Sequence, residues 1–178
     1  EGQTSRIEAT FLEPACGDGR ILCSILEKKI GQCKKVFARE SHKTLFFSFV
    51  SLTTMYGLDI QQKNVELTRQ NLFTLFIKSI KKQDREWIAP AVHHVICKNV
   101  LLADTISAEK DENKLLISQW SPLNTSHIQR QDFYFDSLFK ADKKKASPPS
   151  MGKERGMIIE PVKKTYKSRR IADLVLDA

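Results

Sequence analysis

The segment FLEPACGDGRIL runs from an apolar stretch through a tight turn directly into a helical pattern. Residues 8–14 predict a short strand that ends at Pro14. Apolar side chains at helical spacing predict a helix over residues 20–30, which Gly31 would end. A strand, a glycine turn and a helix in immediate succession are typical of the ligand-binding edge of an open α/β sheet.

Two glycines in the turn, Gly17 and Gly19, allow positive φ and allow a ligand to approach the backbone closely. Leu22 stands where a dinucleotide fingerprint would have its third glycine, and no Gly-Lys-Ser/Thr follows, as a Walker loop would require. The turn therefore favours a nucleoside ligand without a pyrophosphate.

Strands and helices alternate over the first 120 residues, and this alternation predicts an α/β fold with a mainly parallel sheet. The expected elements after the first helix are a helix over 41–53, a strand over 54–60, a helix over 61–82, one or two strands within 93–106 that follow a break at Pro90, and a strand over 114–120. Residues 1–120 thus form the predicted core. Residues 121–178 form a partly irregular, basic C-terminal extension, with a short amphipathic element at 133–139, a linker at 140–156 and one more strand at 156–161.

Acidic side chains stand at three successive predicted strand ends, at Glu13, Asp59 and Asp104. An acid at the second position can accept hydrogen bonds from both hydroxyls of a ribose. The three acids together suit a cationic nucleoside, and S-adenosylmethionine is such a ligand.

Three motifs in this part of the chain resemble those of the Rossmann-like adenine-N6 DNA methyltransferases. FLEPACGDG resembles the first motif of that family, TMYGLDIQQKNVELTRQNL the second and NVLLADTI the third, in the family order over residues 9–120. The resemblance implies S-adenosylmethionine as cofactor. It implies that Glu13 and residues 16–19 hold the methionine part, that Asp59 binds the ribose, that Ile60 packs on the adenine and that Asp104 contacts its amino group. The implied cofactor set is Glu13, Pro14, Ala15, Cys16, Gly17, Asp18, Gly19, Asp59, Ile60 and Asp104.

The catalytic motif of that family, Asp/Asn/Ser-Pro-Pro followed by an aromatic residue, is absent from this sequence. LLISQWSP stands at the corresponding place, and the only Pro-Pro pair, Pro148 and Pro149, has no aromatic residue after it. Catalytic residues are therefore unassigned. The segments LLISQW and RQDFYFDSLF also resemble small methylase-like proteins in which this motif is not evident.

The expected function is S-adenosylmethionine-dependent methyl transfer to adenine N6 of DNA, in a restriction-modification system or a mobile element. The alternative is a degenerate cofactor-binding or DNA-binding subunit, with a partner subunit that supplies the catalytic or target-recognition elements. Methyl transfer to RNA or to a protein side chain is a third alternative.

The formal net charge of +8 favours a polyanionic partner. From residue 129 to the end, 12 Lys and Arg stand against 7 Asp and Glu, so much of the excess lies in the C-terminal extension. DNA is the expected partner, although a solvated tail would give the same composition. The expected phosphate contacts are Lys163, Lys164, Lys167, Arg169 and Arg170.

Other features favour ordinary structural roles. The four cysteines form no Cys-x-x-Cys pair, so zinc and disulfides are not indicated, and a reduced, cytoplasmic protein is expected. The adjacent His93 and His94 do not suit a shared metal, and Trp120 is expected to be a partly buried strand-end residue and not a base-stacking one. No apolar run approaches the ~20 residues of a membrane span.

Overall fold

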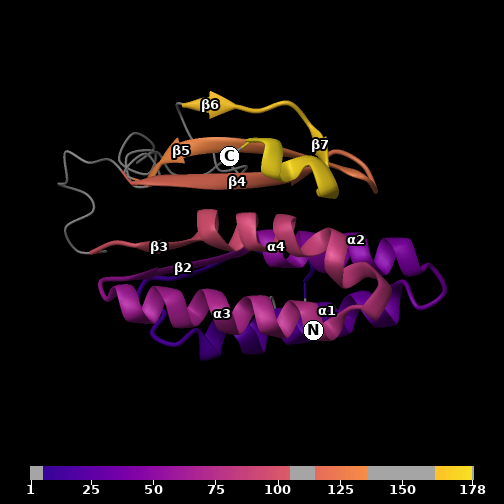
Figure 1. Cartoon of the computed structure of the whole chain (residues 1–178), viewed down its shortest axis with the longest axis horizontal. Coiled ribbons are helices and arrows are strands. Elements are labelled where there is room, and N and C mark those ends of the chain that lie inside the picture. The colour runs from indigo at the N-terminus through magenta and orange to yellow at the C-terminus, as the bar shows by residue number, and fades with distance from the viewer. Residues whose placement is uncertain (1–5, 105–114, 136–162, 178) are drawn as a thin grey trace, which may run out of the picture.

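The computed structural model describes residues 6–104, 115–135 and 163–177 and has an α/β fold (Figure 1). Its first part contains three short parallel strands, β1 (Phe11–Glu13), β2 (Met55–Asp59) and β3 (Val100–Leu102), in the order β1-β2-β3. Phe11 pairs with Met55, and Gly57 pairs with Val100. The parallel arrangement predicted for the first part of the chain is confirmed for these three strands.

Four helices alternate with these strands: α1 (Arg20–Val36), α2 (Ser41–Thr53), α3 (Gln62–Ser79) and α4 (Arg85–Asn99), with a short 3-10 turn, η2 (Lys82–Asp84), before α4. All four contact β2, the central strand. Figure 1 shows α1 and α3 on one side of the parallel strands and α4 on the other. The core that they enclose includes Leu26, Phe49 and Phe76, which have almost no exposed surface.

The sequence analysis predicted that the first helix ends at Gly31. Helix α1 instead continues to Val36. Cys33, one turn from Ile30 on the buried face, has no exposed surface. Packing of this additional turn therefore outweighs the conformational cost of one helical glycine.

The prediction of strands within residues 93–106 is wrong for most of that segment. Helix α4 continues through Pro90 to Asn99, and of the described residues of this segment, up to 104, only Val100–Leu102 form a strand. The run from His94 to Ile96 is buried throughout, because α4 contacts β2 and β3 as well as β4, a strand of a second sheet. A helix buried on most sides loses the polar face that marks helical periodicity, so its apolar run resembles a strand.

The second sheet is antiparallel and separate from the first. It consists of β4 (Leu116–Pro122), β5 (His127–Tyr134), β6 (Lys164–Thr165) and β7 (Arg169–Arg170), and a 3-10 helix, η3 (Ile171–Asp177), follows it. The strand predicted over 114–120 therefore exists but does not extend the parallel sheet. The short amphipathic element predicted at 133–139 begins inside β5. The predicted division at residue 120 falls within β4.

The basic residues near the C-terminus do not form a free tail. Strands β6 and β7 both pair with β5, and η3 packs on α4 with Leu174 buried. The predicted linker at 140–156 and the predicted strand at 156–161 lie outside the described residues, as do Lys143, Lys144 and Lys145. No helix in the described ranges is long and apolar enough to cross a membrane.

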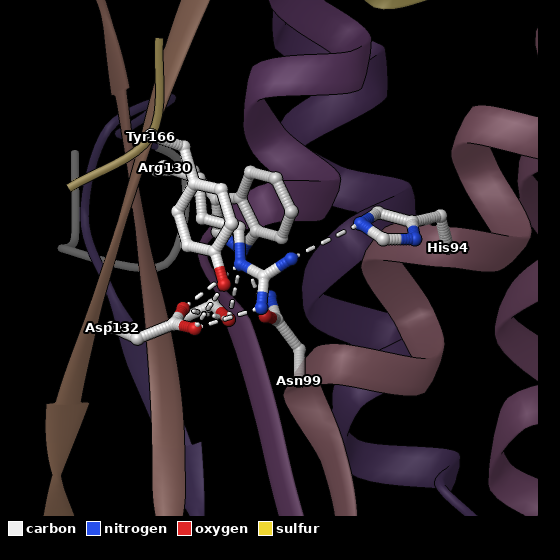
Figure 2. A network of polar contacts seen from close by, with 7 residues as sticks. His94, Asn99, Arg130, Asp132 and Tyr166 are labelled. Carbon is white, nitrogen blue, oxygen red and sulfur yellow. Dashed lines mark hydrogen bonds and ion pairs between the residues drawn. The ribbon is translucent and has the colours of Figure 1, made fainter. Parts of the chain in front are cut away.

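A buried ion pair lies within β5, and Tyr166 connects it to the segment that carries β6 (Figure 2). Arg130 Nε and Nη2 each donate to one carboxylate oxygen of Asp132 at 2.8 Å, and both side chains are less than 10% exposed. Ser118 Oγ donates to Asp132 at 2.8 Å, and the Tyr166 hydroxyl donates to it at 3.1 Å. The Tyr166 ring lies 4.4 Å from the Arg130 guanidinium carbon. Three side chains, from β4, β5 and the segment that follows β6, thus donate four hydrogen bonds to one carboxylate.

The same region joins the antiparallel sheet to the rest of the fold. Trp120 Nε1 donates to Asn99 Oδ1 at 2.8 Å, and Asn99 Nδ2 donates to the carbonyls of Thr53 and Met55. The Tyr56 hydroxyl donates to the Ser118 carbonyl at 2.7 Å. Trp120 therefore has the structural role that was expected, but it lies inside β4 and is buried, not partly buried at a strand end.

Candidate functional site

The three acids of the sequence analysis lie at one edge of the parallel sheet. Glu13 ends β1, Asp59 ends β2 and Asp104 follows β3 by two residues. Because the strands are parallel, their carboxyl ends meet at the same edge, where ligands of open α/β sheets bind. The structure therefore brings the three predicted strand ends together, and their contact with a ligand stays a prediction.

The turn between β1 and α1 has the conformation expected from its glycines. Gly17 has φ 55° and Gly19 has φ 78°, and no other described residue has positive φ. Space beside Gly17 is open, since nothing lies within 4 Å of where its Cβ would be. At Gly19 a Cβ would lie 2.9 Å from the Thr68 side chain, so close packing requires glycine there. Gly17 thus faces open space, and Gly19 faces α3.

Asp59 holds this turn against the end of β2. One carboxylate oxygen accepts the Gly17 amide at 2.9 Å, and the other accepts the Gln61 amide at 2.9 Å and Asn64 Nδ2 at 3.1 Å. Burial alone would raise the pKa of Asp59, but these three hydrogen bonds outweigh it and lower the pKa below its ordinary value. Asp59 is therefore ionised and fixed in position at neutral pH.

Three side chains of α3 that the sequence analysis did not single out also support the turn. Besides Asn64, Thr68 Oγ1 donates to the Gly17 carbonyl at 2.8 Å, and Asn71 Nδ2 donates to the Asp18 carbonyl at 2.8 Å. These residues recur at helical spacing along α3, and Thr68 is fully buried among apolar neighbours. In the sequence, a polar residue at Thr68 on the otherwise apolar face of the predicted helix is the signal that would have drawn attention to this face.

Gly57 in β2 is a second residue that the sequence analysis missed. A Cβ there would lie 3.0 Å from Leu22 and 3.1 Å from the sulfur of Cys16. Cys16 is buried, and burial raises the pKa of its thiol, an effect that the hydrogen bond from Thr68 only partly offsets. Cys16 is thus a packing residue of the turn.

Apolar side chains are exposed on either side of Asp59. Ile60 is 66% exposed directly after β2, and Leu102 is 51% exposed at the end of β3. The Ala103 amide donates to the Asp59 carbonyl at 3.0 Å, which ties the two strand ends together. An exposed isoleucine beside a fixed carboxylate provides an apolar surface next to a hydrogen-bond acceptor.

Of the remaining predicted cofactor residues, Asp18 forms an ion pair with Arg20 at 2.7 Å. Glu13 is half-buried, with one carboxylate oxygen 3.5 Å from the Ala15 amide. Pro14 and Ala15 are exposed at the start of the turn. All ten predicted cofactor residues thus lie in the β1–α1 turn or at or just beyond the carboxyl ends of β1, β2 and β3.

The histidines do not form a metal site. His93 is exposed on α4 with its ring 3.6 Å from the Cys97 sulfur, whereas His94 is nearly buried, 3.5 Å from Arg130. No group of three metal-ligating side chains occurs in the part of the chain that the structure describes. Pro148 and Pro149 lie outside it.

A cavity of about 300 Å³ lies far from this edge, at the opposite ends of α1 and α3. Lys34, Ser41 and Lys81 are among the residues that line it. Since α1 and α3 both begin beside the strand ends and run away from them, this cavity is not part of the candidate site.

The predicted nucleic-acid contacts lie in the antiparallel sheet. Lys164 belongs to β6, and Arg169 and Arg170 form β7, while Lys163 and Lys167 lie beside these strands. All of them except the half-buried Arg169 are exposed.

No family model, no curated protein and no solved structure matches this chain.

Proposed function

We propose that this chain is an S-adenosylmethionine-dependent methyltransferase-like protein that acts on adenine N6 of DNA, of the restriction-modification or mobile-element type. The observation that carries the proposal is the open turn at Gly17, whose amide Asp59 holds at the carboxyl edge of a parallel sheet. The motif resemblance over residues 9–120 supports the same cofactor.

The side chains at this edge fit the chemistry of S-adenosylmethionine. An ionised carboxylate has about four lone-pair sites, and Asp59 uses three of them for its protein donors, which leaves acceptor capacity for a ribose hydroxyl. The exposed Ile60 offers an apolar face to the adenine ring, and Asp104 offers an acceptor to its amino group. Glu13 and Asp18 supply negative charge for the sulfonium and ammonium groups. A Cβ at residue 17 would fill the open space beside the turn.

When bound, S-adenosylmethionine would supply an activated methyl group. The contribution of this chain is to hold the cofactor and exclude alternative orientations, because positioning accounts for much of the acceleration in such transfers. The residues that receive the target base are not assigned.

Transfer of a labelled methyl group tests the proposal. The purified chain is incubated with methyl-labelled S-adenosylmethionine and, in separate reactions, with unmethylated duplex DNA, RNA or a protein mixture. Label recovered as N6-methyladenine in DNA supports the proposal, and label confined to RNA or protein overturns the assignment of DNA as substrate. The Asp59→Ala variant controls for transfer by a contaminating enzyme.

A second candidate function is a cofactor-binding subunit without transfer activity of its own. Within the described residues β1 pairs with β2 alone, and Leu12 at its centre is 44% exposed. The Phe11 amide donates to the Thr54 carbonyl, on the side of β1 that faces β2. Because the peptide groups of successive residues in a strand point to opposite sides, those of Leu12 point away from β2, to the opposite edge. Such an edge can accept a strand from another chain. Cofactor binding without transfer by the isolated chain supports this candidate, and transfer by the isolated chain excludes it.

A further inference from the structure

One face of the antiparallel sheet carries uncharged hydrogen-bonding side chains. Paired residues of an antiparallel ladder share a face. Gln119 pairs with Gln131, which pairs in turn with Thr165, and Ser121 pairs with Gln129. We call these five residues the glutamine face. All are exposed or half-exposed, whereas the intervening positions, including Trp120 and Arg130, are buried against the rest of the fold.

The glutamine face has no negative charge of its own. The only acid in the four described strands is Asp132, which is buried on the opposite face in its ion pair with Arg130. Gln131 Nε2 donates to Thr165 Oγ1 at 3.2 Å, and Gln129 Nε2 donates to the Tyr166 carbonyl at 3.3 Å. These contacts orient the amides and leave their carbonyl oxygens available as acceptors.

Lysines lie at the β6 edge of the sheet, where Lys164 pairs with Asp132 and therefore extends from the face opposite to the glutamine face. Lys163, Lys164 and Lys167 are exposed. The ammonium of Lys163 lies 4.8 Å from the centre of the Tyr134 ring, and that of Lys164 lies 4.3 Å from the centre of the Tyr166 ring. Cation–π contacts thus hold two of these charges beside the strands.

We infer that the glutamine face and its lysine edge form a DNA-binding surface, in which the lysines contact phosphates and the glutamines contact base edges. Lysine neutralises phosphates regardless of sequence. A glutamine amide presents a donor and an acceptor together, which matches the acceptor and donor of adenine in the major groove. A protein partner would be expected to find exposed apolar anchors on such a face, and these five residues offer none.

The surface is preorganised by the network beneath it. Tyr166 connects the lysine-bearing segment to Asp132, and the Lys163 and Tyr166 amides donate to the carbonyls of Asp132 and Arg130. A surface held in this way loses little conformational freedom when it binds.

The inference deepens the proposed function, since it names the part of the chain that contacts DNA, but it does not require cofactor binding. The test is fluorescence anisotropy of a labelled mixed-sequence DNA duplex without S-adenosylmethionine, at salt concentrations from about 50 to about 200 mM. The variant is K163Q/K164Q/K167Q. The matched control, K78Q/K81Q/K82Q, removes equal charge from exposed lysines at the end of α3, just before η2 and in η2.

The lysine-edge variant is expected to lose about 10-fold or more in affinity and to reduce the slope of log K against log salt by about 2 to 3, because each lost phosphate contact contributes about 0.9. The control is expected to retain nearly the wild-type slope. Equal slopes for variant and control overturn the inference, as does binding of RNA with no binding of the duplex.

The glutamines are tested separately with Q119A/Q131A, by selection of preferred sequences from a random DNA pool. This variant is expected to retain the wild-type salt slope and to lose preference for adenine at specific positions. Unchanged preference overturns the assignment of base contacts to these glutamines. Titration of the same variants with S-adenosylmethionine separates the two proposals, since cofactor binding should be unchanged in all of them.

Discussion

The carboxylate of Asp59 accepts the amide of Gly17 at 2.9 Å, although the two residues are 42 positions apart in the chain. This bond connects the end of β2 to the glycine turn that precedes α1. It makes Asp59 a structural part of the turn, and in the function we propose the same carboxylate accepts a ribose hydroxyl.

Replacement of Asp59 by Ala is expected to weaken S-adenosylmethionine binding by about 1 to 3 kcal/mol, because a buried hydrogen-bond acceptor is lost. Calorimetric titration measures the change, and circular dichroism confirms that the variant is folded. Glu86→Ala, at an exposed acid in the first turn of α4, is the matched control. Wild-type affinity in a folded Asp59→Ala protein would remove Asp59 from the site.

Two glycines should respond to alanine in opposite directions. Gly17→Ala is expected to lower the free energy of unfolding by about 1 kcal/mol or more, because its φ of 55° is unfavourable for a residue with a Cβ. Gly31→Ala is expected to raise it by about 0.5 to 1 kcal/mol, because Gly31 lies inside α1 with nothing within 4 Å of an added Cβ. Urea unfolding measures both, and a stabilising Gly17→Ala would contradict the turn conformation.

Buried Lys29 should make stability rise with pH. Its ammonium donates to the carbonyls of Ile7 and Ala9 and to Thr54 Oγ1, and burial lowers its pKa to about 8. Between that value and the ordinary pKa of about 10.4, the unfolded chain binds the proton and the folded chain does not. The free energy of unfolding therefore increases with pH across this window, by up to about 3 kcal/mol from this group.

The measurement is urea unfolding of wild type and Lys29→Met from pH 7 to pH 11. The difference in free energy of unfolding between the two proteins should change with pH between about 8 and about 10.4, since the variant has no lysine to titrate at this position. Lys28→Met, at the exposed neighbour, should change with pH as the wild type does. Parallel profiles for wild type and Lys29→Met would show that Lys29 titrates normally.

The buried ion pair gives a further prediction. Asp132→Ala would leave the Arg130 guanidinium buried without its carboxylate, which is expected to cost about 3 to 5 kcal/mol of stability. The double variant Arg130→Leu/Asp132→Leu removes both charges and should cost much less. Chemical denaturation distinguishes them, and an equal loss in both variants would mean that the charge itself does not matter.

Much of the first part of the fold followed from local pattern. The predicted helix over 41–53 coincides with α2, and the predicted strand, turn and helix from residue 8 onward correspond to β1, the Gly17 turn and α1. These elements are set by short-range signals, namely helical spacing, glycines and strand-end acids. The shared edge of Glu13, Asp59 and Asp104 followed from the same alternation.

The rest depended on tertiary contacts that a single sequence does not display. Part of helix α4 was predicted as strand because the helix is buried between two layers. Strand β4 belongs to a second sheet because it pairs with β5, the next strand in the sequence. Asn64 was missed because its role depends on meeting Asp59 across the β2–α3 turn. The ion pair between Arg130 and Asp132 was not predicted, since nothing in the sequence marks the two residues as buried.

Calorimetric titration of the purified chain with S-adenosylmethionine and with S-adenosylhomocysteine tests the central claim most directly. The account predicts saturable binding of both ligands at micromolar concentrations, and a Gly17→Ala variant that stays folded but binds more weakly. No heat of binding for either ligand, from a protein shown to be folded, would contradict the claim and leave the Gly17 turn as a structural element alone.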